Sequence, residues 1–593
     1  MSFIHRVLGQ LRLGLGLAFV AAFAATAMAQ PATGASATAA ADGPRGNLVS
    51  AAWLQRNLGQ GDLLLLDASG TQAFLAQHIP GAVGVDLYRF GPREASAAEV
   101  ERRVQSWGVS PGRRIVVYDQ GGSMMATWLF FELLHAGVPA GDLFVLDGGL
   151  HQWRAAGGAV TKEATPAPAR GSFRVAGLQE ALRTRLPEML VASGDRRNHV
   201  LVEALEPSQH FGEAAFFDRP GHIPHAVMLP HGDLYNADKT FKSADEIRRM
   251  LGYLGVKPEQ QVHSYCGGGV AATVPFFALR FIAGYPRVRL YKESQLEWLQ
   301  DERGLPFWTY GAPYLMRETR WLNTWGGKMM RMFGGAQISV IDVRAAEEFR
   351  RGHLPFAVNV PAEVFRAHLR EPARLAEALG RAGVKATDEA VVVSESGLDA
   401  NAALAWLLLE SLGQKKVSVF MDSIDRWAEL GFEVARPAVV AAAASAASAA
   451  SAASAAPKAS APAPAAPRPV SYAAEPRKEM LVADAGGAGS EAGAAAAAVV
   501  AGTPAPYPRV FVASGRQAPT KPPAGKVVHL PVTEVVQANG APKAAKDLWK
   551  AFVKAGVPRY AEIVLFADDP ADAAANHFIF KLMGFPDVKV WLR

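Results

Sequence analysis

The sequence predicts an α/β protein built from tandem domains, each a parallel sheet flanked by helices. Three observations lead to this fold class. Short runs rich in Val, Ile and Leu alternate with helical patterns, which is typical of parallel α/β units. One motif recurs along the chain, as expected of a repeated domain. The length of 593 residues matches roughly four domains of about 150 residues each.

The first part of the motif is an apolar run that ends at one defined position, which is acidic in three copies. These positions are Asp67, Glu203, Asp342 and, in the fourth copy, Val512. A His-apolar-Pro turn follows each run, at His78, His222, His353 and His529. A structural hydrogen bond within the turn is a simpler explanation for these histidines than a role as catalytic bases. We therefore expect a strand and a histidine-stabilised turn in every copy.

The second part of the motif is another apolar run, then a loop and a helical pattern. Aligning these runs places four residues at one equivalent position: Asp119, Cys266, Glu395 and Ala567. A third run follows the helix and leads to a tryptophan in three copies: Trp153, Trp298 and Trp427. Loops that leave the carboxyl ends of parallel strands carry the chemistry of α/β proteins. The position after the second strand is therefore the expected site.

The repeats and the composition divide the chain into segments. They are a signal segment 1–29, domains 46–165, 185–310, 335–436 and 507–593, and a linker 437–506. The linker is rich in Ala, Ser and Pro, so it cannot bury a core, and a transient Ala-rich helix is the alternative. A connector over residues 307–335 is rich in Trp, Met and Arg, and we expect it to pack neighbouring domains together.

The N-terminus has the pattern of a secretory signal. Arg6 and Arg12 precede an uncharged apolar run that ends in Ala27, Met28 and Ala29, a small-x-small cleavage pattern. The run is shorter than the ~20 residues of a spanning helix, so we expect cleavage after Ala29, with an uncleaved anchor as the alternative. The mature protein is then expected to be exported, to the periplasm if the source has two membranes, without stable membrane insertion.

Composition excludes several classes of protein. The net charge is +6 over the full length, and no dense Lys/Arg run or basic aromatic strip indicates nucleic-acid binding. The chain has one cysteine, which excludes an intrachain disulfide framework and a multi-cysteine zinc or iron–sulfur site. The histidines show no recognisable metal-ligand spacing. We expect neither a metal nor a cofactor.

The single cysteine, Cys266, ends the apolar run VHSYC and precedes Gly267, Gly268 and Gly269 and a helical pattern. In a strand–loop–helix turn with three glycines, successive backbone N–H groups can point inward, and the helix N-terminus adds partial positive charge. This environment stabilises a thiolate and, one bond further out, a persulfide. The alternative is a buried, inert cysteine. The sequence favours a nucleophile at Cys266.

On these residues the repeat resembles the rhodanese domain of the sulfurtransferase family. The resemblance rests on the acidic strand end, HIPGA at His78, HIPHA at His222 and the loop CGGGVAA at Cys266. It implies that Cys266 carries sulfur as a persulfide from a small donor to an acceptor such as cyanide or a thiol. It also implies a sulfur- and substrate-binding loop formed by Gly267, Gly268, Gly269, Val270 and Ala271. Copies without the cysteine resemble catalytically silent domains of the family.

The resemblance leaves two donors open. CGGGVAA is similar to the CG(S/T)GVT loop of mercaptopyruvate sulfurtransferases and lacks the two basic residues of the CRKGVT loop of thiosulfate enzymes. Mercaptopyruvate enzymes also hold the substrate carboxylate with arginines. Here the family's Asp-x-Arg is Glu203-Ala204-Leu205, the next arginine position is His210, and only Arg219 remains as a clamp. Because Ala271 also replaces a threonine, we favour thiosulfate or another sulfane-sulfur donor, with mercaptopyruvate as the alternative.

A function of another class is a non-catalytic scaffold or sulfur-carrier binding protein whose silent domains bind a protein partner. Three of the four copies lack the cysteine, which favours this alternative. The intact glycine loop at Cys266 argues against it, because a scaffold has no need of such a loop. No second cysteine is present to resolve a persulfide, so the sulfur acceptor is expected to come from outside the chain.

Overall fold

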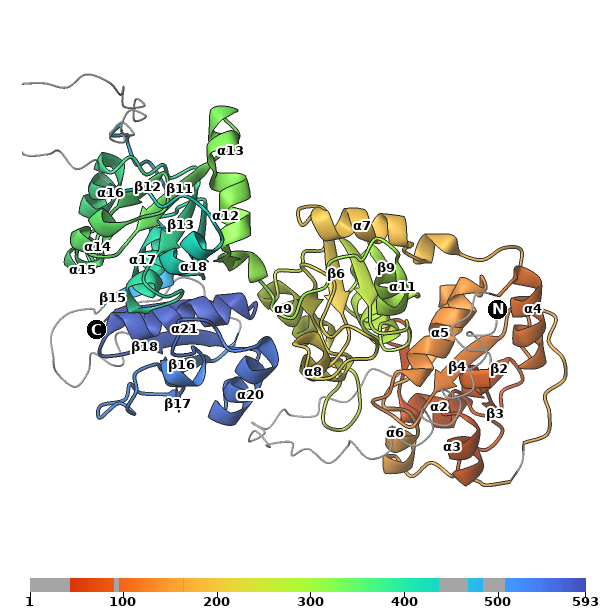
Figure 1. The fold of residues 1–593 in the computed structure, drawn as a ribbon. Helices are drawn as coiled ribbons and strands as arrows, with labels where there is room; N and C mark the ends of the chain where they lie inside the picture. The colour runs from red at the N-terminus through yellow and green to blue at the C-terminus, as the bar shows by residue number, and fades with distance from the viewer. Residues whose placement is uncertain (1–42, 90–94, 164, 437–467, 484–506, 593) are drawn as a thin grey trace, which may run out of the picture. The chain divides into compact units, whose positions relative to one another are not determined.

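The structure is a computed structural model that describes residues 43–89, 95–163, 165–436, 468–483 and 507–592. Within these residues the chain forms four sheets of parallel strands with helices packed on them, which confirms the α/β fold class (Figure 1). We call the four units the first to the fourth repeat. The predicted signal segment lies outside the described residues. Among the described helices, none has the length and apolar character needed to span a membrane.

The first repeat has the strand order β1-β5-β4-β2-β3. Its strands are β1 (Leu48–Val49), β2 (Leu63–Asp67), β3 (Val83–Gly84), β4 (Arg114–Tyr118) and β5 (Leu143–Leu146). Its helices are α2 (Ala51–Asn57), α3 (Thr71–Ala76), α4 (Ala97–Ser106), α5 (Met125–His135) and α6 (Gly149–Ala155). Helix α5 is buried on nearly every face, as expected of a helix that is apolar all round.

The second repeat has the strand order β7-β6-β8-β9. Its strands are β6 (His199–Glu203), β7 (Val227–Met228), β8 (Gln261–Tyr265) and β9 (Val288–Leu290). Its helices are α7 (Leu186–Gly194), α8 (Pro207–His210), α9 (Ala244–Tyr253), α10 (Thr273–Phe277) and α11 (Ser294–Gln300). A parallel bridge from Arg183 to Leu290 occupies the place that β1 has in the first sheet.

The third repeat has the strand order β10-β14-β13-β11-β12. Its strands are β10 (Met316–Arg317), β11 (Ile338–Asp342), β12 (Ala357–Asn359), β13 (Glu389–Val393) and β14 (Lys416–Phe420). Its helices are α12 (Thr319–Gly326), α13 (Lys328–Met332), α14 (Ala346–Arg351), α15 (Ala362–Ala367), α16 (Pro372–Arg381), α17 (Ala400–Ser411) and α18 (Ile424–Glu429). The predicted start at residue 335 is wrong, because Met316 pairs with Val419 and opens the sheet.

The fourth repeat has the same order, β15-β19-β18-β16-β17. Its strands are β15 (Leu481–Ala483), β16 (Arg509–Ala513), β17 (Lys526–His529), β18 (Glu562–Phe566) and β19 (Val588–Leu592). Its helices are α20 (Ala545–Ala555) and α21 (Pro570–Leu582). The fourth sheet therefore begins before residue 507, where the sequence placed its start.

The predicted linker 437–506 is wrong over its described part. Residues 468–483 contact the third repeat before they supply β15. The Tyr472 hydroxyl donates to Gln414 Oε1 over 2.7 Å, and Arg477 forms an ion pair with Glu410. Composition did not indicate that this segment is ordered, because the few side chains that anchor it lie among many Ala and Pro residues.

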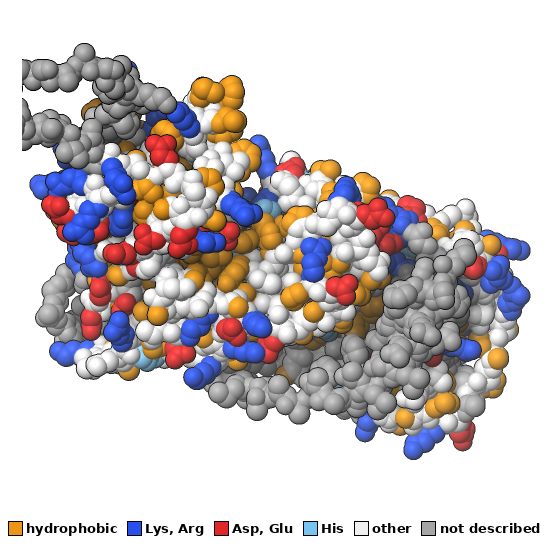
Figure 2. Space-filling model, viewed as in Figure 1, with side chains coloured by type: hydrophobic (Ala, Val, Ile, Leu, Met, Phe, Trp, Pro, Cys, Tyr) orange, Lys and Arg blue, Asp and Glu red, His pale blue; other side chains and the backbone are white. Residues whose placement is uncertain are grey.

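The connector 307–335 does not have one role along its length. Near its start, the Tyr310 hydroxyl donates to the Lys543 carbonyl of the fourth repeat over 2.9 Å, which agrees with the expected packing between repeats. At its other end the expectation is wrong, since Met329, Met332 and Phe333 are 69%, 73% and 74% exposed. Figure 2 shows hydrophobic side chains gathered at the tip formed by α13. Between these ends, Leu322 packs into the core of the third repeat.

The turn histidines and the tryptophans occupy equivalent places in three repeats. The imidazole Nδ1 atoms of His78, His222 and His353 each lie 2.9 Å from a carbonyl oxygen of the preceding segment. The indole N–H groups donate to nearby carbonyls in the same way: Trp153 to Ala159, Trp298 to Pro306 and Trp427 to Glu433. The histidine contacts agree with the structural role expected from the sequence, whereas the tryptophan contacts were not predicted.

Strand register corrects two of the predicted equivalences. The acidic strand ends pair with the last residue of the second strand: Asp67 with Tyr118, Glu203 with Tyr265 and Asp342 with Val393. The residue after Val393 is Ser394, so Ser394 and not Glu395 corresponds to Cys266. In the fourth repeat Ala513 pairs with Phe566. Ala567 is thus correctly aligned, whereas the strand end is Ala513 and not Val512.

The fourth His-apolar-Pro turn is also not equivalent to the others. His529 pairs with Ala513 in the sheet, the place held by Met228 opposite Glu203 and by Asn359 opposite Asp342. His529 therefore belongs to a strand, and its match to the other turns is a coincidence of sequence.

The repeats share cores through the helix that follows the second strand. Helix α5 packs on α10, with the rings of Phe130 and Phe277 centred 4.9 Å apart. Helix α17 packs on α21, where Trp406 and Phe578 are 5.0 Å apart. The start of α10, just after the cysteine loop, is thereby held against the first repeat, with Thr127 and Thr273 hydroxyls 2.9 Å apart.

Candidate functional site

Cys266 follows β8 at the carboxyl end of the second sheet, as the sequence predicts. The residue is 3% exposed and its thiol is free. The Gly269 N–H donates to its Sγ over 3.1 Å. Its own N–H donates to the Ser294 hydroxyl over 3.0 Å. The backbone amide of Gly269 therefore contacts the sulfur and can stabilise negative charge on it.

The glycines of the loop have different roles. Gly269 has a left-handed backbone with φ +87°, and a Cβ there would lie 2.0 Å from the Lys292 carbonyl oxygen. Only glycine fits this place, and the conformation directs its N–H at the sulfur. A Cβ on Gly267 would meet the Phe216 ring at 3.1 Å, whereas one on Gly268 would meet nothing within 4 Å. Gly269 is thus the glycine that the loop geometry requires.

The last two residues of the predicted loop lead into α10. The Val270 carbonyl accepts the Thr273 hydroxyl over 2.7 Å, and Ala271 is 7% exposed. The Ala272 carbonyl accepts the Ser264 hydroxyl over 2.7 Å. These bonds join the loop both to the strand before it and to the helix after it.

The start of α11 supports the loop from behind, which the sequence did not predict. Ser294 accepts the Cys266 N–H and donates its hydroxyl to the Tyr291 carbonyl over 2.8 Å. The Gln295 N–H donates to the Cys266 carbonyl and the Leu296 N–H to the Gly267 carbonyl, both over 3.1 Å. The only sequence signal for these residues is that they follow the third strand, whose end lies at the same sheet edge as Cys266.

Ser294 itself has φ +54°, a left-handed conformation that is unfavourable for a residue with a Cβ. Residues held in such conformations cluster at functional sites. The hydroxyl that this backbone presents to the Cys266 N–H gives a physical reason for it.

A buried network lies beside the loop. Gln295 Nε2 donates to Glu203 Oε1 over 2.7 Å and to the Gly221 carbonyl over 3.1 Å. The other carboxyl oxygen of Glu203 is hydrogen-bonded to His210 Nδ1. The His210 ring stacks on His222 with centroids 3.7 Å apart. One arginine position of the family is thus filled by His210, which pairs with Glu203 at the family's aspartate position, and Glu203 connects to the cysteine loop through Gln295.

Burial determines the protonation of this network. It raises the pKa of Glu203 to about 7 and lowers the pKa of His210 and of His222 to about 3. Both imidazoles are therefore neutral at physiological pH, and Glu203 is the group of this network that titrates near pH 7. The network carries little net positive charge and cannot replace arginines as a carboxylate clamp.

The carboxylate and two imidazoles bring potential metal ligands within 4.8 Å of one another. A metal ion, however, lies in the plane of each imidazole that binds it, about 2.0–2.1 Å from the nitrogen. The planes of His210 and His222 are parallel within 1° and stacked, so no point lies in both planes. In this arrangement the trio is a hydrogen-bonded network rather than a metal centre.

Arg219, the predicted substrate clamp, faces another part of the second repeat. Its guanidinium donates to the Leu305 carbonyl over 2.9 Å and lies 5.9 Å from the centre of the Phe307 ring. It fastens the segment after α11. The structure brings Gly269 to the sulfur of Cys266 but shows no such contact for Arg219.

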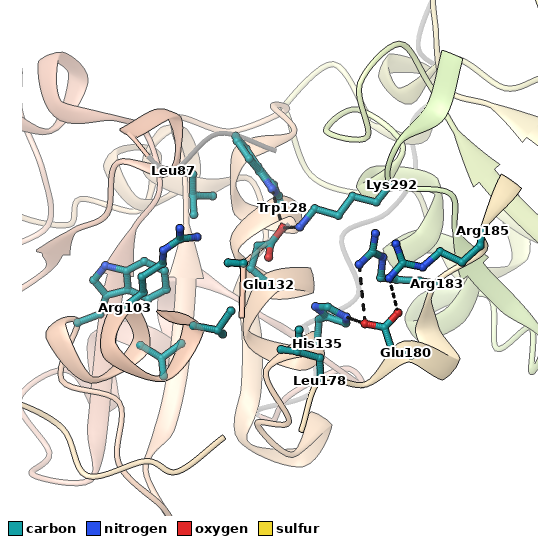
Figure 3. A pocket seen from close by; sticks show the side chains of 14 residues that line it. Leu87, Arg103, Trp128, Glu132, His135, Leu178, Glu180, Arg183, Arg185 and Lys292 are labelled. Atoms are coloured by element: carbon teal, nitrogen blue, oxygen red, sulfur yellow. Dashed lines mark hydrogen bonds and ion pairs between the residues drawn. The ribbon is translucent and has the colours of Figure 1, made fainter. Parts of the chain in front are cut away.

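Lys292 connects the turn before Ser294 to the first repeat. Its ammonium lies 2.6 Å from Glu132 Oε1, which also accepts the Trp128 indole N–H over 3.1 Å (Figure 3). Burial tends to raise the pKa of Glu132, but the nearby Lys292 ammonium holds that pKa below its usual value. These groups line a cavity of about 80 Å³, room for several water molecules.

In the first repeat, the loop that corresponds to the cysteine loop binds a side chain of the same repeat. Asp119 stands at the position of Cys266, and its carboxylate accepts the Gly121 N–H over 2.7 Å and the Ala126 N–H over 2.9 Å. The loop amides therefore surround a carboxyl group of the protein itself, whose pKa is raised by burial despite these hydrogen bonds. In the third repeat the Ser394 hydroxyl instead donates to the Gly397 carbonyl over 2.9 Å.

The fold and the site define a class of protein: tandem parallel α/β repeats in which one repeat carries a cysteine held by a glycine loop at the sheet edge. The chain belongs to the rhodanese-like domain family, whose model matches residues 50–156, 187–301 and 327–430. The fourth repeat lies outside these matched segments.

Three known relatives each match less than half of this chain. A probable 3-mercaptopyruvate sulfurtransferase of Pseudomonas aeruginosa is 31% identical over 282 residues, which are 43% of this chain and 96% of the relative. SseB of Mycobacterium tuberculosis, which carries the name of a thiosulfate sulfurtransferase, is 30% identical over 250 residues, 40% of this chain and 84% of the relative. The solved structure of SseA from Escherichia coli matches with TM-score 0.38 and 24% identity, covering 42% and 98% of the two chains.

Proposed function

We propose that this protein is a sulfurtransferase that carries a sulfane sulfur as a persulfide on Cys266. One observation carries the proposal: the Cys266 sulfur, buried at the carboxyl end of a parallel sheet, accepts the Gly269 N–H over 3.1 Å. A nucleophilic cysteine needs a stabilised thiolate, and backbone amides at a helix start supply that stabilisation. The names of the relatives at about 30% identity support the same chemistry.

In the proposed reaction the Cys266 thiolate attacks the outer sulfur of thiosulfate. The new sulfur–sulfur bond forms as the old one breaks, and its electron pair leaves on sulfite. The terminal sulfur of the persulfide then carries the negative charge. An external nucleophile, cyanide or a thiolate, attacks that sulfur and returns Cys266 to its thiolate. The Gly269 N–H is the group placed to stabilise charge on the cysteine sulfur.

The choice of thiosulfate as donor rests on the site residues, since relatives named for both donors match at 30% and 31% identity. A keto acid needs a cationic clamp for its carboxylate. Here Arg219 is engaged with Leu305, and His210 is a neutral partner of Glu203. For thiosulfate, we propose that the N–H groups of the cysteine loop bind the anion. 3-Mercaptopyruvate is the second candidate, favoured by the Pseudomonas relative.

We further propose that the protein is exported to the periplasm through its N-terminal signal segment. The first, third and fourth repeats, which carry Asp119, Ser394 and Ala567 at the cysteine position, are proposed to be catalytically silent and to contact a protein partner. Fractionation of cells that express the full chain, with mass analysis of its N-terminus, tests both export and cleavage after Ala29.

The decisive experiment is mass spectrometry of the purified protein after mixing with thiosulfate. We expect the Cys266 peptide to gain the mass of one sulfur atom and to lose it again on addition of cyanide, with thiocyanate released. The Cys266→Ser variant is the control and should gain nothing. Parallel reactions with 3-mercaptopyruvate rank the donors. If neither donor modifies Cys266, the scaffold alternative is favoured over the enzyme. Equal turnover by the serine variant would refute the mechanism through Cys266.

A further inference from the structure

A second cavity, of about 280 Å³, lies between the second and the fourth repeat. Apolar side chains from both repeats form much of its wall, among them Met228, Leu254, Met583 and Phe585. Its volume is close to the lower end of the range for small-molecule sites, about 300–1,000 Å³. Cys266 is not among its lining residues, so the cavity is separate from the sulfur site.

The charges that face this cavity have one sign. Arg196, Arg559 and Lys581 line it, and no aspartate or glutamate does so among the described residues. Arg559 is neutralised by an ion pair with Asp233. In the described part of the chain, Arg196 and Lys581 have no carboxylate within ion-pair distance. A cavity with two uncompensated cations favours an anion.

Lys581 is the most informative of these cations because it is partly removed from water. It lies on α21, and burial lowers its pKa despite the attraction of Glu410 and Asp587. Glu410 is itself paired with Arg477. A partly desolvated ammonium without an ion pair is unfavourable, and a bound anion would remove that cost.

Two histidines add polar groups to the wall. His225 has a left-handed backbone with φ 64°, at the turn position that Gly81 occupies in the first repeat with φ +81°. Burial lowers the pKa of His225 to about 4, so its ring is neutral. The ring stands edge-on to Trp308, 4.5 Å between centroids. His210, the other histidine of the wall, is the neutral partner of Glu203.

We propose that this cavity is a binding site for a small organic anion, a carboxylate, sulfonate or phosphate joined to an apolar or aromatic body. Lys581 and Arg196 would neutralise the anionic group, and the Met and Phe side chains would contact the apolar part. Because the fourth repeat supplies Arg559, Lys581 and the wall beside them, the site exists only in a chain that has this repeat packed against the second.

Isothermal titration calorimetry of the full chain with three probes of similar shape tests the charge preference. Benzenesulfonate and benzoate should bind with a Kd of about 0.1–1 mM, whereas neutral benzamide should bind at least tenfold more weakly. The Cys266→Ser variant should bind the anions with unchanged Kd, which separates this site from the proposed sulfur chemistry. Equal binding of benzamide, or no binding of either anion at 10-fold above that Kd range, would overturn the proposal.

Variants locate the site. Lys581→Met and Arg196→Met should each weaken benzenesulfonate binding about tenfold, the usual effect of losing a charge-assisted hydrogen bond. Lys550→Met is the matched control, since Lys550 is 54% exposed, pairs with Glu213 and lies outside the cavity lining. Arg196 is exposed, so we expect Arg196→Met to fold normally. This variant therefore tests the site even if Lys581→Met does not fold. Unchanged affinity in the Arg196 variant, or an equal loss in the Lys550 variant, would show that the anion binds elsewhere.

Discussion

The backbone N–H of Gly269 donates a hydrogen bond to the sulfur of Cys266 over 3.1 Å. The equivalent loop of the first repeat makes the same kind of contact to the carboxylate of Asp119, from Gly121 and Ala126. Two repeats thus use their loop amides to hold a side chain that is, or can become, an anion. The loop donates backbone N–H groups to that side chain in both, and only the second repeat places a nucleophile in it.

Gly269→Ala tests whether this hydrogen bond requires glycine. The substitution places a Cβ 2.0 Å from the Lys292 carbonyl in a left-handed backbone. We expect a loss of at least about 2 kcal/mol in the free energy of unfolding and a fall of about 100-fold in thiosulfate:cyanide turnover. Denaturant titration and a thiocyanate assay measure the two effects. Gly268→Ala, which meets no atom within 4 Å, should cost less than about 0.5 kcal/mol.

Ser294→Ala and Ser294→Gly separate the role of the hydroxyl from backbone strain. Both variants leave the Cys266 N–H without its acceptor, and we expect each to lower kcat/KM about tenfold. The glycine variant relieves the strain at φ +54° and should be more stable than the alanine variant by about 1 kcal/mol. The assays are turnover and denaturant titration. If the more stable of the two variants also had the higher turnover, the Ser294 hydroxyl would have no role in positioning Cys266.

Glu203→Gln tests the buried network through pH. Burial raises the pKa of Glu203 from 4.5 to about 7 in the folded protein, so the fold favours the protonated acid. The free-energy cost of burying the charged carboxylate is absent below the pKa of Glu203 in the unfolded chain. It is fully present above the pKa of Glu203 in the folded protein. Relative to wild type, the glutamine variant should therefore gain about 3 kcal/mol between about pH 4 and pH 8.

Unfolding curves across this pH range measure the difference between the two proteins. Glu302→Gln, which changes an exposed carboxylate, is the control and should follow wild type at every pH. A constant difference between wild type and the Glu203 variant would mean that Glu203 ionises as an ordinary exposed acid.

Lys292 and Glu132 form an ion pair between the turn behind the cysteine loop and the first repeat, with exposed side-chain fractions of 11% and 22%. Lys292→Met and Glu132→Leu each leave one charge unpaired, and we expect each to cost about 1–3 kcal/mol of stability. The double variant should cost less than the sum of the two, as for residues in direct contact. Additive losses in a double-mutant cycle would argue against coupling between them.

Sequence reasoning identified repeats correctly but misplaced residues at strand ends. It aligned Glu395 with Cys266, whereas the pairing of Asp342 with Val393 makes Ser394 the equivalent residue. It took His529 for a turn residue, although His529 pairs with Ala513 in a strand. Local patterns show that a strand exists. Its register is decided by hydrogen bonds to a strand that lies some fifty residues away, which no local pattern contains.

The sequence by itself determined the α/β class, the repetition and the single position where a repeat carries sulfur, because strand and helix periodicity and residue identity are local properties. Tertiary structure decided what surrounds that sulfur. Ser294 reaches Cys266 from the end of another strand, His210 takes Glu203 as its partner, and the fourth repeat closes a cationic cavity against the second. These are contacts between segments far apart in the chain, so they form only when the sheets and helices have packed.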